Sequence, residues 1–167
     1  MKSQKKSLII AQLACNVVYK LASKATANRL KKILLSIIDD TQSTFVHGRL
    51  ITDNVLVAFK TMHHINMKKG GRKGEMALKL DMSKAYDRVE WGCLDKIMNK
   101  LGFEGRLRKL LLTCISIVTY FGRINGKPHG HIVPSRGLRQ GDPLSLCLFL
   151  LYAESLSALI KKGVGDG

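Results

Sequence analysis

The sequence predicts an α+β fold in which a small antiparallel sheet packs on helices. From residue 13 to residue 38, apolar side chains recur at intervals of three and four, which is the period of an amphipathic helix. From residue 76 to residue 81, apolar side chains alternate with small or charged ones, which is the period of a strand with one face on a core. Asn125-Gly126 separates two segments rich in β-branched and aromatic residues and predicts a hairpin.

The composition predicts one basic domain that binds polyanions. Its 167 residues and 46% hydrophobic content are enough for a buried core, which excludes a disordered tail. Lys and Arg number 28 against 12 Asp and Glu, so the net charge is +16. Residues 1–74 carry 14 basic and three acidic side chains, and we expect most of the phosphate-facing surface there. A ribosomal-type or membrane-surface protein would share this charge.

The spacing of cysteine and histidine indicates neither a disulfide framework nor a zinc site. The four cysteines include no CxxC pair, and the five histidines have no cysteine or carboxylate at ligand spacing. The first 15 residues imitate a secretory signal, but Gln12 interrupts their short apolar run. We therefore expect a nuclear or cytoplasmic protein that is not secreted.

Basic residues are frequent in the first half of the chain. Lys20, in the helical stretch over residues 13–38, is a candidate contact to nucleic acid, with a solvated helix face as the alternative. Asp53 is expected to cap a helix. The loop Met67 to Gly74 has four basic residues among three glycines, so it either touches a nucleic-acid backbone or is a solvated linker, which we favour slightly.

Two helices and the hairpin are expected after the strand. The first helix runs from Trp91 to Leu101, and Gly102 stands at the position of a C-terminal stop. The second covers residues 105–116. The hairpin strands are expected within residues 117–124 and 129–133.

The stretch from Pro134 to Ile160 combines a basic loop with an apolar helix. Arg136 and Arg139 share the loop with two glycines, so guanidinium groups and backbone amides can crowd a phosphate or a base pair. Asp142 is expected as the N-cap and Pro143 as the first helical residue. The helix is apolar enough to suggest a membrane span, but it is slightly short and Glu154 near its middle would be costly in lipid. We therefore expect a buried core helix and no membrane partner.

Residues 78–91, LKLDMSKAYDRVEW, resemble the first catalytic motif of reverse transcriptases, in the version typical of plant non-LTR (LINE-type) retrotransposons. The resemblance implies that Asp81 ligates catalytic Mg²⁺, with the backbone carbonyl of Met82 as a further ligand. It also implies that Tyr86 blocks the 2′-hydroxyl of an incoming ribonucleotide.

Two further stretches resemble the same family, in the family's order. Residues 41–56, TQSTFVHGRLITDNVL, resemble the block whose basic residue approaches the phosphates of the incoming nucleotide, which implies this role for Arg49. The loop before Asp142 resembles the second motif, and the resemblance implies that Gln140 and Gly141 pack against the incoming nucleotide and the template base. The sequence departs from the family at Leu146, where proline is usual.

The resemblance implies the fingers and part of the palm of a polymerase over residues 13–162, after a diverged N-terminal extension over 1–12 and before a tail over 163–167. RNA template, DNA primer and dNTP are the implied partners. In the family two Mg²⁺ ions are also held by a third motif with paired aspartates, which this chain does not reach, so we expect a truncated chain with an incomplete metal site and without the rest of the palm and the thumb. The expected function is that of a fragment of an RNA-directed DNA polymerase, inactive alone; the alternative is a non-catalytic nucleic-acid-binding remnant.

Overall fold

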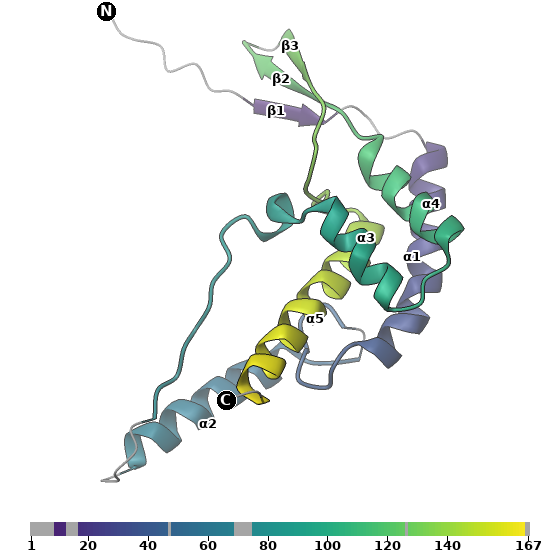
Figure 1. Cartoon of the computed structure of the whole chain (residues 1–167). Helices are drawn as coiled ribbons and strands as arrows, with labels where there is room; N and C mark the ends of the chain where they lie inside the picture. Colours follow the sequence, from purple (N-terminus) through teal and green to yellow (C-terminus); the bar gives the residue numbers. More distant parts are fainter. Residues whose placement is uncertain (1–8, 13–16, 47, 69–74, 126, 166–167) are drawn as a thin grey trace, which may run out of the picture.

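The protein is mostly helical and carries one small antiparallel sheet (Figure 1). The computed structural model describes residues 9–12, 17–46, 48–68, 75–125 and 127–165. In chain order, the elements are β1 (Ile9–Gln12), α1 (Val17–Ile37), α2 (Ile51–Met67), the 3-10 helix η1 (Ala85–Arg88), α3 (Trp91–Lys100), α4 (Gly105–Ser116), β2 (Tyr120–Ile124), β3 (Lys127–Ile132) and α5 (Pro143–Gly165). The signal-like segment, except residues 9–12, and most of the glycine-rich loop at 67–74 lie outside the described residues.

The locally encoded elements form where the sequence predicts them. Residues 17–37 form one helix, and α4 has the predicted bounds. Gly102 follows α3 with a φ of 80°, and Asn125 follows β2 with a φ of 51°, so both turns use the left-handed conformation that their residue types tolerate. Asp53 is an exception: it lies in the first turn of α2, whose N-cap position is Leu50, and the predicted cap is therefore wrong.

The sheet has the strand order β1-β2-β3, and both pairs are antiparallel. β1 pairs with β2 in the register Ile9↔Arg123. Residues 1–12 are a diverged N-terminal extension in the sequence-based prediction, which has no strand there. Among the described residues, the buried core includes no residue of β2 or β3, and all of β3 is exposed. The sheet lies beside the helices and adds no described residue to the buried apolar cluster, so the expectation that it packs on the helices stays a prediction (Figure 1).

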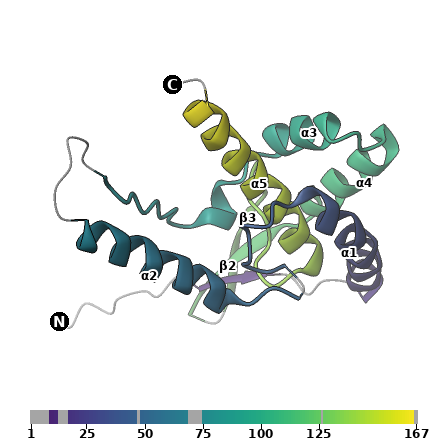
Figure 2. The same ribbon diagram turned by 90° about the horizontal axis from the view of Figure 1, so that it is seen from below.

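The buried core is built by α1, α3, α4 and α5, with α5 in contact with α1 and α3 (Figure 2). Leu144, Leu148 and Leu151 on the first half of α5 are fully buried, at 0% exposure. They meet Leu30 and Leu34 of α1 within one apolar cluster. The second half of α5 is exposed, so the predicted core helix is a core element over its first half only. By length and composition α5 could cross a membrane, and 33% of its most apolar window is buried inside the protein.

The predicted strand over residues 76–81 is not formed. Residues 75–82 are extended but belong to no strand, and the side chains of Met76, Leu78 and Leu80 are 70% to 85% exposed. A strand needs a neighbour that accepts its backbone hydrogen bonds and a core that covers its apolar face, and the described residues supply neither here. Alternating apolar residues indicate that a segment can form a strand, but a strand forms only where a neighbouring strand pairs with it.

The start of α5 is fixed by a buried carboxylate. The Oδ2 atom of Asp142 accepts hydrogen bonds from the backbone N–H of Ser145 at 3.1 Å and from its hydroxyl at 3.0 Å, which confirms the predicted N-cap. Its Oδ1 atom accepts a hydrogen bond from Ser23 of α1 at 2.5 Å, and Tyr19 donates to Oδ2 at 3.5 Å. One side chain therefore both caps α5 and joins it to α1.

Three hydrogen bonds join the loop before α5 to residues 86–91, which run from η1 to the start of α3. The N–H groups of Gly137 and Leu138 donate to the carbonyl oxygens of Val89 and Tyr86, at 2.8 and 2.9 Å. The indole N–H of Trp91 donates to the carbonyl oxygen of Gly137 at 2.7 Å. We call these three hydrogen bonds the Gly137 clasp. Gly137 has a φ of 91°, and an added Cβ would lie 3.2 Å from the Asp87 carbonyl oxygen, so the close approach requires glycine.

Ser23→Ala should lower the free energy of unfolding by about 1–3 kcal/mol, because it leaves the buried Asp142 carboxylate without one of its donors. Urea denaturation of the 167-residue chain measures this change. Ser36→Ala on the same helix is the matched control, since the Ser36 hydroxyl is exposed and bonds only to the carbonyl of Ile33; it should change stability by less than about 0.5 kcal/mol. Equal effects of the two substitutions would contradict the role of Ser23.

Gly137→Ala should destabilise the protein by about 1–3 kcal/mol, since alanine is strained at positive φ and its Cβ would press on the Asp87 backbone. Gly92→Ala in α3 is the control, because a Cβ there meets nothing within 4 Å and the backbone is helical. Thermal or urea unfolding of both variants gives the comparison. A Gly137→Ala protein as stable as Gly92→Ala would show that the clasp does not depend on glycine.

Candidate nucleotide and nucleic-acid site

Three of the residues singled out in the sequence line one cavity between α1, η1 and the start of α5. This cavity, of about 500 Å³, is lined by Tyr86, Gln140 and Gly141. We call it the Tyr86 cavity. The Gly137 clasp brings the three together, because it holds the loop of Gln140 against the segment of Tyr86. The other residues that line the Tyr86 cavity are Lys31, Phe45, Asp142, Pro143 and Leu146.

Tyr86 is held by packing on α5. Its ring stacks on Phe149 with a centroid distance of 4.5 Å and an interplanar angle of 12°. Burial, and secondarily the nearby Cys147, raises the pKa of Tyr86, so its hydroxyl stays neutral at physiological pH. Gln140 is exposed at the rim, and Gly141 has a φ of 82°, which allows the chain to turn sharply into α5. The cavity thus offers an aromatic ring and polar groups on a rigid base.

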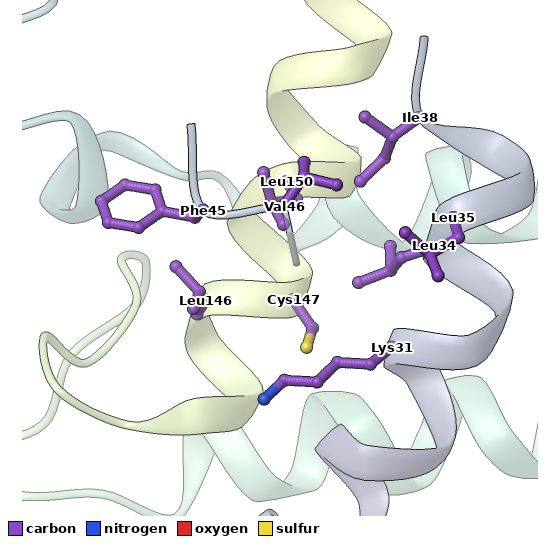
Figure 3. Close-up of a pocket in the computed structure, with 9 residues that line it drawn as sticks. All are labelled: Lys31, Leu34, Leu35, Ile38, Phe45, Val46, Leu146, Cys147 and Leu150. Atoms are coloured by element: carbon purple, nitrogen blue, oxygen red, sulfur yellow. The ribbon is translucent and has the colours of Figure 1, made fainter. Parts of the chain in front are cut away.

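Lys31 and Phe45 line the same cavity and were not identified as site residues from the sequence. Lys31 lies four residues after the buried Ala27 and three before the buried Leu34, so helical spacing alone could have placed it on the inner side of α1. Its side chain extends from α1 toward the base of α5 (Figure 3). Both residues also border a smaller apolar pocket of about 160 Å³ between α1 and α5.

A larger cavity, of about 900 Å³, adjoins the first and shares Gln140 with it. Arg136 and Arg139, both predicted contacts to nucleic acid, line it, together with Lys84 and Arg88, whose role the sequence analysis missed. We call this cavity the basic groove. Its aromatic side chains are Tyr19, Trp91 and Tyr120. Arg136 also forms an exposed ion pair with Glu90 at 3.2 Å, which is weak in water.

The basic groove suits single-stranded nucleic acid. Cations attract the phosphate backbone, and aromatic rings interleaved with them give bases a surface to stack on. Asp87 is the acidic residue among the side chains that line it. The geometry therefore predicts binding that weakens as salt increases.

Arg49 and Lys20 line neither cavity. The Nη1 atom of Arg49 donates to the carbonyl oxygens of Asp39 and Gln42, each at 2.5 Å, and Nη2 pairs with Asp40 at 3.0 Å. The guanidinium therefore ties together the loop that follows α1. Lys20 is exposed on α1, next to Tyr19 of the basic groove. Their predicted contacts to phosphate stay predictions.

Asp81 and Met82 lie on the exposed, extended segment and line neither the Tyr86 cavity nor the basic groove. In the described part of the chain, no group of three or more His, Cys, Asp or Glu side chains is placed to hold a metal ion. A pair of Mg²⁺ ions needs several oxygen ligands in fixed positions. The arrangement of Asp81 does not fit such a pair, so its role as a metal ligand remains a prediction.

Comparison with known proteins agrees with the motif resemblance. The model of the family described as reverse transcriptase (RNA-dependent DNA polymerase) matches residues 4–165. The transposon TX1 uncharacterized 149 kDa protein of Xenopus laevis is 33% identical over 144 residues, which are 86% of this chain and 11% of that protein. An uncharacterized mitochondrial protein of Arabidopsis thaliana is 57% identical over 44 residues, 26% of this chain and 36% of that protein.

A third relative is the retrovirus-related Pol polyprotein from the type-1 retrotransposable element R2 of Popillia japonica, which is 26% identical over 94 residues. That match covers 56% of this chain and 16% of the polyprotein. The chain thus spans between 11% and 36% of the length of these three relatives. Because the family model covers nearly all of its residues, this chain belongs to the reverse transcriptase (RNA-dependent DNA polymerase) family and is related to proteins of non-LTR retrotransposons.

Proposed function

We propose that this chain supplies the nucleotide- and template-binding part of an RNA-directed DNA polymerase from a non-LTR retrotransposon, equivalent to the fingers and part of the palm. The observation that carries the proposal is the convergence of Tyr86, Gln140 and Gly141 on one cavity that adjoins the basic groove. In this proposal the Tyr86 cavity receives the dNTP, and the basic groove receives the single strand of the RNA template that the DNA primer has not yet paired with. Family membership supports these classes of ligand.

In this proposal, DNA synthesis needs a larger protein that contains this chain together with a complete Mg²⁺ site. Membership of the family implies Mg²⁺ in intact members, and Asp81 is the carboxylate that the resemblance assigns to it. That side chain stands on an exposed segment, and in the described residues no group of three or more His, Cys, Asp or Glu side chains is placed to hold a metal ion. We therefore expect the 167-residue chain to bind nucleic acid and nucleotide but to add no nucleotide to a primer.

A second candidate function is nucleic-acid binding without any part in catalysis. The exposed position of Asp81 favours it, whereas the convergence in the Tyr86 cavity favours a polymerase component. The two candidates differ in nucleotide binding: a remnant that only holds nucleic acid needs no dNTP pocket.

Primer extension tests the proposed division between binding and synthesis. With Mg²⁺, dNTP and a DNA primer on an RNA template, the 167-residue chain should give no extension above a no-protein control, because its described residues hold no assembled metal site. Asp81→Asn should leave binding of the same template and primer unchanged. Robust incorporation that Asp81→Asn abolishes would overturn this prediction and make the chain a polymerase by itself.

Binding of single-stranded RNA should become less salt-dependent when two cations of the basic groove are removed. The double variant Arg88→Gln/Arg136→Gln should reduce the slope of log affinity against log salt concentration by about 1.4, since each phosphate contact on a single strand contributes about 0.7. Fluorescence anisotropy of a labelled oligonucleotide at several salt concentrations measures the slope.

Lys60→Gln/Lys100→Gln is the matched control for the groove variant. It removes the same net charge from α2 and α3, at residues that line none of the cavities described above. Its slope should stay close to that of the unaltered chain. If both double variants reduced the slope equally, the binding would follow net charge and the groove would have no special part in it.

A further inference from the structure

Phe45 combines three properties that a core residue would not need. Its backbone φ is 63°, a value that residues other than Gly, Asn and Asp rarely adopt. Its side chain is 55% exposed, although it is large and aromatic. It also lines the Tyr86 cavity. Strained backbone that persists at an exposed aromatic residue points to a role outside folding.

The loop that carries Phe45 is rigidly held. Arg49 donates to two carbonyl oxygens of the loop, those of Asp39 and Gln42. The Ser43 hydroxyl donates a hydrogen bond to the side-chain oxygen of Asn54 in α2 at 2.6 Å. Val46, the residue after Phe45, is buried in the core. The ring of Phe45 is therefore presented to the cavity by a fixed backbone, which reduces the entropy cost of binding.

Phe45 is also the aromatic side chain of this cavity that no other aromatic ring of the described residues covers. The cavity has two aromatic residues, and Tyr86 already stacks on Phe149 with one face. Within the described part of the chain, no aromatic ring stacks on Phe45. A planar ligand can therefore lie on Phe45 without displacing an aromatic ring.

Lys31 supplies the cation of the same cavity. No acidic side chain of the described residues forms an ion pair with it. Figure 3, which draws the smaller apolar pocket that both residues also border, shows the side chain of Lys31 running from α1 toward the base of α5 and Phe45 on the opposite side of Leu146 and Cys147. An aromatic ring and an ammonium group that line one cavity match the two parts of a nucleotide: a flat base and a charged phosphate chain.

We propose that Phe45 is the stacking platform for the nucleobase in the Tyr86 cavity and that Lys31 binds the phosphates of the same nucleoside triphosphate. This inference rests on the proposed function, since it assigns two further residues to the nucleotide that the family would bind. It also gives Arg49 a positioning role, because that residue fixes the loop of Phe45 and lies off the cavity.

Phe45→Asn is the sharpest test, because asparagine tolerates positive φ and the loop should keep its fold while losing the ring. Isothermal titration calorimetry with the magnesium salts of dGTP and of inorganic tripolyphosphate separates base from phosphate. Phe45→Asn should weaken dGTP binding about tenfold and leave tripolyphosphate binding unchanged. Lys31→Gln should weaken both about tenfold, because both ligands carry the phosphate chain.

Two control variants match the substitutions. Phe59→Asn removes an exposed aromatic ring from α2, and Lys32→Gln removes the neighbouring charge on α1; neither residue lines the cavity, and neither change should affect dGTP binding. Urea denaturation should show that Phe45→Asn is at least as stable as the unaltered chain.

The possible outcomes separate this inference from the proposed function. If the chain binds dGTP and Phe45→Asn binds it equally well, the stacking role is overturned while the nucleotide cavity stands. If Lys31→Gln behaves like Lys32→Gln, the phosphate role is overturned. If the unaltered chain binds no dGTP, the nucleotide cavity of the proposed function and this inference fall together, and RNA binding in the basic groove then supports the second candidate function.

Discussion

The Gly137 clasp is the constraint on which the rest of the site depends. Three hydrogen bonds join two segments that lie far apart in the sequence, one running from Tyr86 to Trp91 and the other leading to Gln140. Glycine at position 137 favours them, because it tolerates the φ of 91° and lets the loop approach the backbone of Asp87. Both cavities lie along this junction, so the site depends on two backbone hydrogen bonds and on the one from the Trp91 indole.

The buried carboxylate of Asp142 gives that junction a fixed base. It caps α5 and accepts a hydrogen bond from Ser23, so α1 and α5 keep their relative position where the Tyr86 cavity lies between them. Acidic side chains are rarely buried unless every oxygen has a partner, and here both oxygens do. The same side chain is therefore unavailable as a metal ligand.

The side chains to which the proposed function assigns binding and the carboxylate to which it assigns Mg²⁺ lie in different surroundings. Side chains suited to binding a nucleotide and a nucleic-acid strand are gathered around cavities and held by packing, as in the stack of Tyr86 on Phe149. The carboxylate expected to hold Mg²⁺ lies on an extended segment whose apolar residues, such as Leu78 and Leu80, face solvent. An exposed apolar segment of this kind is costly to leave uncovered.

The sequence by itself determined what depends on near neighbours: the helices, the Asn125 turn, the cap at Asp142 and the motifs that indicate the family. Tertiary structure decided which residues share a cavity. It placed Lys31 and Phe45 in the same cavity as Tyr86. It also directed the Arg49 side chain to the loop that follows α1 and left residues 76–81 without a strand partner. The reason is that helical periods, turns and caps are set within a few residues along the chain, whereas strand pairing and cavity lining depend on segments that meet only after folding.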